Sequence, residues 1–141
     1  MTPEEKAEHN KHVVRQAIQA LNDRNLDRFF SYHTEDTTSH EVYFPAPLGR
    51  HDFRAFLEEW LAAYPDAHIE TQAMIAEGDR VAVENVLTAT FRQPFRGTAP
   101  TGRPFTVREG VFFELADGKI RRARIYLDQK TTEQQLGLGG G

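Results

Sequence analysis

The chain has 141 residues, a formal net charge of −4, 39% hydrophobic residues and no cysteine. This length fits one domain with a packed core, and the acidic balance argues against a nucleic-acid partner. Disulfides and thiolate chemistry are excluded. No apolar run reaches membrane-spanning length and the polar N-terminus does not resemble a signal peptide, so we expect no membrane partner and a cytoplasmic location. We expect a single domain over residues 1–136 and a Gly-rich tail at 137–141.

The first third of the chain has the periodicity of helices. Thr2 suits a helix cap, Pro3 suits the first helical position, and the acids that follow favour the positive end of the helix dipole. A second, short helix is expected over residues 26–33, then an extended piece over residues 42–44, and a third helix after Gly49. Apolar stripes run along the first and third helices: Val14, Ala17, Ile18 and Leu21, then Phe53, Phe56, Leu57, Trp60, Leu61 and Tyr64.

After Pro65 the apolar spacing becomes that of strands. Four long strands are expected over residues 68–77, 81–92, 104–115 and 120–128. Gly78 and Gly118 mark the tight turns within the first and second pairs of strands. Helices followed by an antiparallel meander predict an α+β fold, with the helices packed on one face of the sheet.

Strand alternation separates the inward face from the outward face and exposes two unusual positions. Glu109 belongs to the same face as Val107 and Val111, and Asn85 to the same face as Val83 and Leu87. On the last strand the inward face carries apolar side chains only: Ala123, Ile125 and Leu127. The sequence therefore predicts one carboxyl and one amide in an otherwise apolar interior.

Glu109 is the main catalytic candidate. A buried, unpaired carboxylate costs several kcal/mol, so an apolar site raises its pKa toward the range of a general acid or base near neutral pH. A carboxyl bonded to a neighbour in the core, without chemistry, is the alternative interpretation. For Asn85, a hydrogen-bonded structural amide stands beside the interpretation that it contacts substrate.

Two histidines are further candidates for proton transfer, because the pKa of histidine lies near neutrality. His33 falls at the end of the second expected helix, and a buried histidine bonded to a backbone carbonyl is its alternative interpretation. His40 precedes the extended piece, and it is otherwise a surface loop residue. The chain has no HxH or HExxH pair, so we expect no metal site.

Three segments in a fixed order resemble the SnoaL-like polyketide cyclase family of the nuclear transport factor 2-like superfamily. The resemblance covers nearly the whole chain, and the joint order of the segments is more specific than any one of them. The segments are residues 13–22 leading into Leu26-Asp27, residues 77–83 followed by Pro100-Thr101-Gly102-Arg103, and Asp117-Gly118-Lys119-Ile120 continuing to Tyr126-Leu127-Asp128 and Gln135-Leu136-Gly137.

The resemblance implies a cone: a strongly curved antiparallel sheet wrapped around three N-terminal helices, with a pocket at the wide end. Members of this superfamily include cyclases, isomerases, epoxide hydrolases and non-catalytic binders, so the fold leaves the activity open. It also implies a homodimer formed through the sheet. Its pocket position and the inward faces of the strands give five expected substrate-binding residues besides Asn85: Tyr43, Phe56, Trp60, Val111 and Ile125.

The usual catalytic sets of the superfamily are absent. The positions that match the isomerase residues are apolar: Ala17, Phe44 and Val111. The epoxide hydrolase positions match Asn85, Leu87 and Ile125, and the last of these also replaces the aspartate of the cyclases. Asp128 matches a second aspartate at the end of the strand, where it caps the following turn.

Two functions fit these observations. The first is a cofactor-independent enzyme that moves protons on a small hydrophobic ring compound, in a cyclisation, isomerisation or hydration, with Glu109 as base or acid, His33 or His40 assisting and Asn85 polarising an oxygen. The second is a dimeric protein of the same fold that binds a hydrophobic small molecule without chemistry.

Overall fold

The computed structural model describes residues 1–138, so residues 139–141 of the expected Gly-rich tail lie outside the described part. Helix α1 (Pro3–Asn22) begins as the sequence predicts. Thr2 Oγ1 accepts a hydrogen bond from the Glu5 N–H, and the Glu5 carboxylate accepts one from the Thr2 N–H, each at 3.1 Å. This reciprocal capping box satisfies two backbone donors at the helix start.

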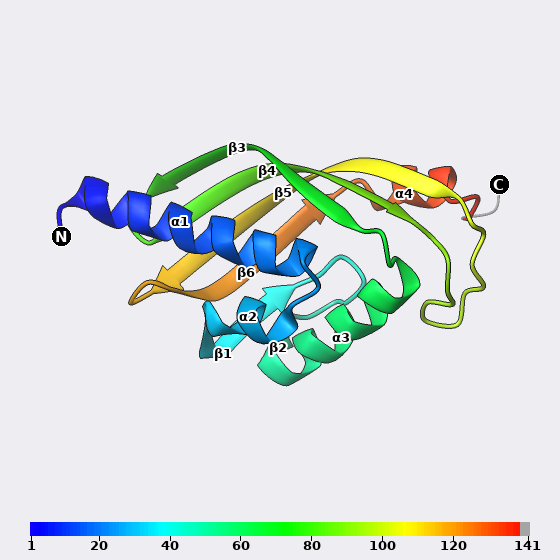
Figure 1. The fold of residues 1–141 in the computed structure, drawn as a ribbon, viewed down its shortest axis with the longest axis horizontal. Helices are drawn as coiled ribbons and strands as arrows, with labels where there is room; N and C mark the ends of the chain where they lie inside the picture. Colours follow the sequence, from blue (N-terminus) through cyan, green and yellow to red (C-terminus); the bar gives the residue numbers. More distant parts are fainter. Residues whose placement is uncertain (139–141) are drawn as a thin grey trace.

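The remaining elements follow α1 in a simple order (Figure 1). They are α2 (Leu26–Ser31), β1 (His33–His40), β2 (Leu48–Gly49), α3 (Arg50–Ala63), β3 (His68–Glu77), β4 (Arg80–Thr90), β5 (Pro104–Ala116), β6 (Lys119–Leu127) and α4 (Gln129–Gln135). Within the described residues, no helix is long and apolar enough to cross a membrane.

The strands form one six-stranded sheet in the order β2-β1-β6-β5-β4-β3. Neighbouring strands are antiparallel, except that β1 runs parallel to β6. Figure 1 shows the long strands curving over α1, with α2 and α3 beneath the β1 side of the sheet. The expected α+β fold with a curved sheet is confirmed, and the buried apolar residues fill the space between sheet and helices.

The sequence prediction was wrong in the segment between α2 and α3. The helix ends at Ser31, and His33 is the first residue of β1 rather than the end of a helix. Residues 42–44 form a turn instead of an extended piece, in which the Phe44 N–H donates to the Glu41 carbonyl at 3.2 Å. Strand β1 was not predicted because its buried side chains, such as Thr37 and Ser39, are small and polar.

The four long strands are confirmed, with ends within two residues of those expected. Strand β3 carries an irregularity: the pairing with β4 shifts between Thr71 and Ala73. This bulge exchanges the two faces of the strand, because side chains alternate with a period of two. Ile69 packs on the core before the bulge and Met74 after it, while Ile75 is 71% exposed.

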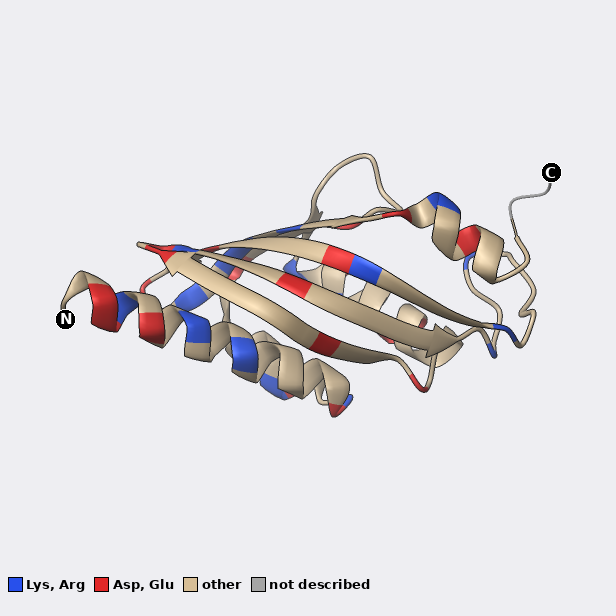
Figure 2. Cartoon of the chain, turned by 90° about the horizontal axis from the view of Figure 1, so that it is seen from above, with Lys and Arg blue, Asp and Glu red and all other residues tan. Residues whose placement is uncertain are grey.

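The outer face of the sheet carries paired charges. Glu114 on β5 lies within 4 Å of three arginines, Arg80, Arg122 and Arg124, at 3.8, 3.3 and 3.9 Å. These contacts pair opposite charges across neighbouring strands. Figure 2 shows basic and acidic positions interspersed along α1 and the strands. Phe112 and Tyr126 are half-exposed beside these charges, and the homodimer through this face stays a prediction.

Two asparagines of α1 attach the helix to the edge strand β3 and the turn after it. Asn10 Nδ2 donates to the Gly78 carbonyl at 3.0 Å. Asn22 makes two bonds to Ile69, since its Nδ2 donates to the carbonyl at 2.9 Å and its Oδ1 accepts from the N–H at 2.8 Å. These bonds satisfy backbone groups of an edge strand, which would otherwise have no partner on that side.

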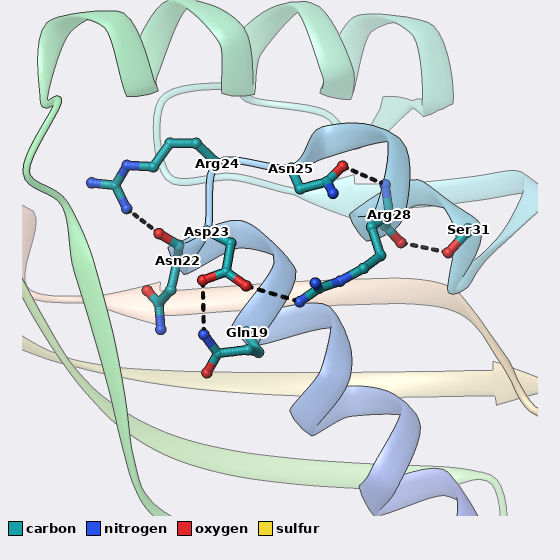
Figure 3. A network of polar contacts seen from close by, with 7 residues as sticks. All are labelled: Gln19, Asn22, Asp23, Arg24, Asn25, Arg28 and Ser31. Carbon is teal, nitrogen blue, oxygen red and sulfur yellow. Dashed lines mark hydrogen bonds and ion pairs between the residues drawn. The ribbon is translucent and has the colours of Figure 1, made fainter.

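The end of α1 is held by polar contacts on the surface (Figure 3). Asp23 accepts from Gln19 at 3.0 Å and from Arg28 at 3.1 Å. Arg24 has the left-handed φ of 58° that commonly ends a helix, and its guanidinium donates to the carbonyls of Asn22 and Pro65. The chain therefore turns sharply from α1 into α2 and brings α2 under the sheet.

We expect Asn22→Ala to lower the free energy of unfolding by about 1–3 kcal/mol, because two partly buried backbone groups of β3 lose their partner. Gln19→Ala is the matched control, since it removes an exposed side-chain bond on the same helix and should change stability by less than about 0.5 kcal/mol. Urea unfolding measures both. Equal losses in the two variants would contradict the anchoring role of Asn22.

Candidate functional site

A cavity of about 120 Å³ lies between the inner face of the sheet and the helices. An engineered protein cavity of roughly 150 Å³ binds benzene, so this cavity has room for about one six-membered ring. Most of its wall is apolar. All six expected substrate-binding residues line it: Tyr43, Phe56, Trp60, Asn85, Val111 and Ile125. Glu109 and His33 also line it, whereas His40 is not among the lining residues of the described chain.

Glu109 reaches the cavity from the middle of β5, at the centre of the sheet. It pairs with Asn85 of β4 on one side and with Leu127 of β6 on the other. The residue is 8% exposed. Side chains directly opposite each other on antiparallel strands lie close together, and Asn85 Nδ2 donates to Glu109 Oε1 at 3.1 Å. The predicted inward orientation of both residues is confirmed.

Burial raises the pKa of the Glu109 carboxyl, and the hydrogen bond from Asn85 opposes that rise only in part. Among residues 1–138, no ion pair within 4.0 Å and no second side-chain hydrogen bond joins this carboxyl. An ionised carboxylate is stabilised by a cation or by several donors, and Glu109 has one amide. A carboxyl with a raised pKa at the wall of a cavity can serve as a general acid or base.

Asn85 is fixed by its neighbours on both sides. Its Oδ1 accepts from Thr71 Oγ1 at 2.8 Å, while its Nδ2 donates to Glu109. The three side chains form a line across β3, β4 and β5, at the strand position just before the bulge in β3. Because the Thr71 bond determines which end of the amide faces Glu109, Asn85 presents a donor to the carboxyl. These two bonds favour the structural interpretation of Asn85, and they also let Asn85 orient Glu109.

Glu41 is a site residue that was not among the catalytic or substrate-binding candidates of the sequence. It lies in the turn after β1 and lines the cavity, and its Oε1 accepts from Ser39 Oγ at 3.0 Å. Ser39 itself is fully buried. Burial raises the pKa of Glu41 to about 7, and the nearby negative charge of Glu109 contributes to that rise. The alternation of the small buried side chains Thr37 and Ser39 indicates a strand that ends beside Glu41, and it was the sequence signal that could have identified this residue.

His33 occupies an aromatic box at the other end of β1. Its ring lies 4.5 Å from the ring centre of Phe29 and 5.4 Å from that of Phe30. His33 Nδ1 lies 2.8 Å from the Phe29 carbonyl, which only accepts, so the proton is on Nδ1. Burial lowers the pKa of His33 to about 4. The histidine is thus neutral at pH 7, and its Nε2 is a hydrogen-bond acceptor rather than a carrier of charge.

His40 and Tyr43 flank the turn that carries Glu41. His40 follows Ser39 on β1 and pairs with Arg124 of β6, so it lies on the face of the strand away from the cavity. The structure does not bring it together with Glu109. Tyr43 does face the cavity, where its ring packs on Phe56 at 5.6 Å. Burial raises the pKa of the Tyr43 hydroxyl, which lies beside the side chains of Gln129 and Trp60.

Asp128 lies outside the cavity, as the sequence predicts. Its carboxylate accepts from the Thr131 N–H at 3.0 Å and from the Thr131 hydroxyl at 2.6 Å, and so caps α4. These bonds lower the pKa of Asp128. Within residues 1–138, no group of three or more His, Asp or Glu side chains is placed to hold a metal ion.

In the described residues, the curved sheet and the helices thus surround a ring-sized, mostly apolar cavity whose wall includes two glutamates. The chain belongs to the SnoaL-like polyketide cyclase family, whose sequence model matches residues 11–136. The resemblance seen in the sequence is therefore confirmed. No curated protein sequence matches the chain.

Solved structures share the fold over nearly the whole chain. A proposed SnoaL-like polyketide cyclase from Jannaschia sp. CCS1 has 22% identity and a TM-score of 0.86, over 99% of this chain and 98% of that one. IdmH, a proposed polyketide cyclase from Streptomyces antibioticus, has 25% identity and a TM-score of 0.79, over 92% and 99%. AclR, a proposed hydroxylase from Streptomyces galilaeus, has 24% identity and a TM-score of 0.80, over 91% and 80%. Proteins that share this fold are thus named for different activities.

The raised pKa of Glu109 predicts how stability changes with pH. Between the pKa of an unfolded Glu, about 4.3, and the higher folded pKa, the unfolded chain has lost the proton that the folded chain keeps. The free energy of unfolding therefore falls as pH rises through this window. Glu109→Gln removes the fall, so we expect its Tm to exceed that of the wild type at pH 8 and to match it at pH 4.

Thermal unfolding followed by circular dichroism measures this difference. The expected result is a Tm difference between variant and wild type that is larger at pH 8 than at pH 4. Glu84→Gln is the control, because Glu84 lies on the exposed face of β4. A Glu109→Gln variant that is no more stable than the wild type at pH 8 would show that the carboxylate is compensated in the fold.

Proposed function

We propose that the chain is an enzyme that moves protons on a small hydrophobic ring compound without a cofactor, in a cyclisation, isomerisation or hydration. The observation that carries this proposal is the Glu109 carboxyl, buried at the wall of an apolar cavity with one amide donor. A buried carboxyl with a raised pKa can accept or donate a proton, and this one lies where a bound ring would lie.

The cavity favours an uncharged substrate. No lysine or arginine of residues 1–138 lines it, while two glutamates do. A bound carboxylate or phosphate would meet these acids without a compensating cation, which is costly in an apolar site. The apolar wall and the room for about one ring therefore support a neutral cyclic ketone or a similar compound.

Each polar side chain has a role in this proposal. Glu109 removes a proton from carbon next to a carbonyl, and Asn85 orients it through the 3.1 Å bond. His33 accepts a hydrogen bond from a substrate hydroxyl through Nε2, since its other nitrogen is engaged by Phe29. Phe56 and Trp60 of α3 pack on the ring from the helical side. His40, on the other face of β1, is given no role.

The test is proton exchange with β,γ-unsaturated cyclohexenone in heavy water, followed by NMR and by the absorbance of the conjugated isomer. We expect the wild type to accelerate deuterium uptake at the α-carbon. Glu109→Gln should lower the rate by about 10²–10⁴-fold, the contribution of a positioned general base. Glu84→Gln on the outer face should retain the wild-type rate.

A second candidate is a protein of the same fold that binds its ligand without chemistry, favoured by the apolar residues at the superfamily's usual catalytic positions, such as Ala17 and Ile125. Trp60, the single tryptophan, lines the cavity and reports binding by its fluorescence. A ketone that quenches Trp60 while neither the wild type nor Glu109→Gln exchanges protons would support the binder and contradict the enzyme.

A further inference from the structure

A second carboxyl, Glu41, faces the cavity from another part of the sheet than Glu109. The register defines their relation: Ser39 of β1 pairs with Ala123 of β6, and two residues further on the same face of β6, Ile125 pairs with Val111 of β5. Glu41 follows Ser39 by two residues but lies in the turn after β1, and Glu109 lies two residues before Val111 on β5, opposite Leu127. The two glutamates therefore approach the cavity from backbones two strands apart, about 10 Å at the usual strand spacing, and offset along the strands.

The two carboxyls are held in the same manner. Ser39 Oγ donates to one oxygen of Glu41 at 3.0 Å, and Asn85 Nδ2 donates to one oxygen of Glu109 at 3.1 Å. No Lys, Arg or His of residues 1–138 forms an ion pair with either one. Within residues 1–138 each carboxyl is thus oriented by a single neutral donor, and its other oxygen can meet a ligand in the cavity.

Two such groups in one apolar cavity influence each other's ionisation. The first to lose its proton places a negative charge near the second, which then holds its own proton more tightly. Burial raises the pKa of both carboxyls, and the hydrogen bonds from Asn85 to Glu109 and from Ser39 to Glu41 each oppose that rise. The negative charge of Glu109 raises the pKa of Glu41 further, which favours Glu109 as the base and Glu41 as the acid of the pair.

We propose that Glu41 is the catalytic acid that works with Glu109 as base on opposite parts of one bound, uncharged cyclic ketone. The proposal rests on the proton-transfer function proposed above and adds a second catalytic residue to it. A ring that fits between the two carboxyls presents its carbonyl oxygen to Glu41 and its α-carbon to Glu109.

The proton transfers balance without a cofactor. The Glu109 carboxylate takes the proton from the α-carbon of a β,γ-unsaturated ketone, the C–H electron pair forms the new carbon–carbon double bond, and the Glu41 carboxylic acid protonates the carbonyl oxygen. The product is a neutral dienol. Glu109 then returns its proton to the γ-carbon while Glu41 takes back the hydroxyl proton, which leaves the conjugated ketone and both glutamates as at the start.

This arrangement makes a neutral intermediate possible in an apolar site. A base alone would create an enolate, whose negative charge is costly where no cation lines the wall. An acid at the oxygen removes that charge as it forms, and the developing charge is what an enzyme gains most by stabilising. The same argument favours ketones over carboxylic acids, which already carry a charge at neutral pH.

The experiment compares the wild type, Glu41→Gln, Glu109→Gln and Glu84→Gln in the isomerisation of β,γ-unsaturated cyclohexenone, each as a pH profile of kcat/KM. We expect Glu41→Gln to lower kcat/KM by about 10²–10⁴-fold and to lose the alkaline limb of the profile, which reflects ionisation of the acid. Glu41→Asp should recover part of the rate. A Glu41→Gln variant with the wild-type rate and profile would overturn the proposal.

A second measurement needs no substrate. With ¹³C-labelled glutamate, NMR follows the titration of Glu41 in the wild type and in Glu109→Gln, and we expect the pKa of Glu41 to fall in the variant because a negative neighbour is removed. An unchanged titration of Glu41 in the variant would overturn the proposal that the two carboxyls act as a coupled pair. A wild type that exchanges no protons with the ketone contradicts the proposed function, whereas exchange that depends on Glu109 alone contradicts only the role of Glu41.

Discussion

The burial of the Glu109 carboxyl beside one amide donor and no cation is the constraint on which the rest of this site depends. Its position on β5, the strand between β4 and β6, keeps it away from the surface. The hydrogen bond from Asn85, itself held by Thr71, is the compensation that the sheet supplies. Because that compensation is incomplete, burial raises the pKa of the carboxyl.

The curvature of the sheet places this carboxyl at the wall of a cavity. Strands β4, β5 and β6 bend over α1, and α3 closes the other side with Phe56 and Trp60. The small side chains of β1 let its end approach the cavity, so that the turn after His40 places Glu41 at the wall. The neutral His33 at the start of β1 completes a cavity wall that has acceptors and acids but no positive charge among the described residues.

Much of this arrangement was predictable where burial involves large apolar side chains. The alternation of Val81, Val83, Leu87 and their partners revealed the inward faces of β4 and β5, and with them Glu109 and Asn85. Strand β1 was not predictable, since a strand whose buried residues are Thr37 and Ser39 has no apolar period. The role of Glu41 and the place of His33 in β1 were therefore not predicted.

Other features depend on contacts that no local pattern encodes. The proton on His33 Nδ1 follows from the Phe29 carbonyl one helical turn away, and the bulge in β3 appears only in its pairing with β4. The shared electrostatics of Glu41 and Glu109 require β1 to lie beside β6 in parallel, which a meander pattern does not predict.

The most direct test of this site is a crystal structure of the Glu109→Gln variant soaked with β,γ-unsaturated cyclohexenone. We expect density for the ring inside the cavity, with its α-carbon within about 3.5 Å of the side chain at position 109 and its carbonyl oxygen toward Glu41. A cavity that stays closed to the ketone, with the compound bound elsewhere or not at all, would contradict the assignment of Glu109 as the base of a ketone site.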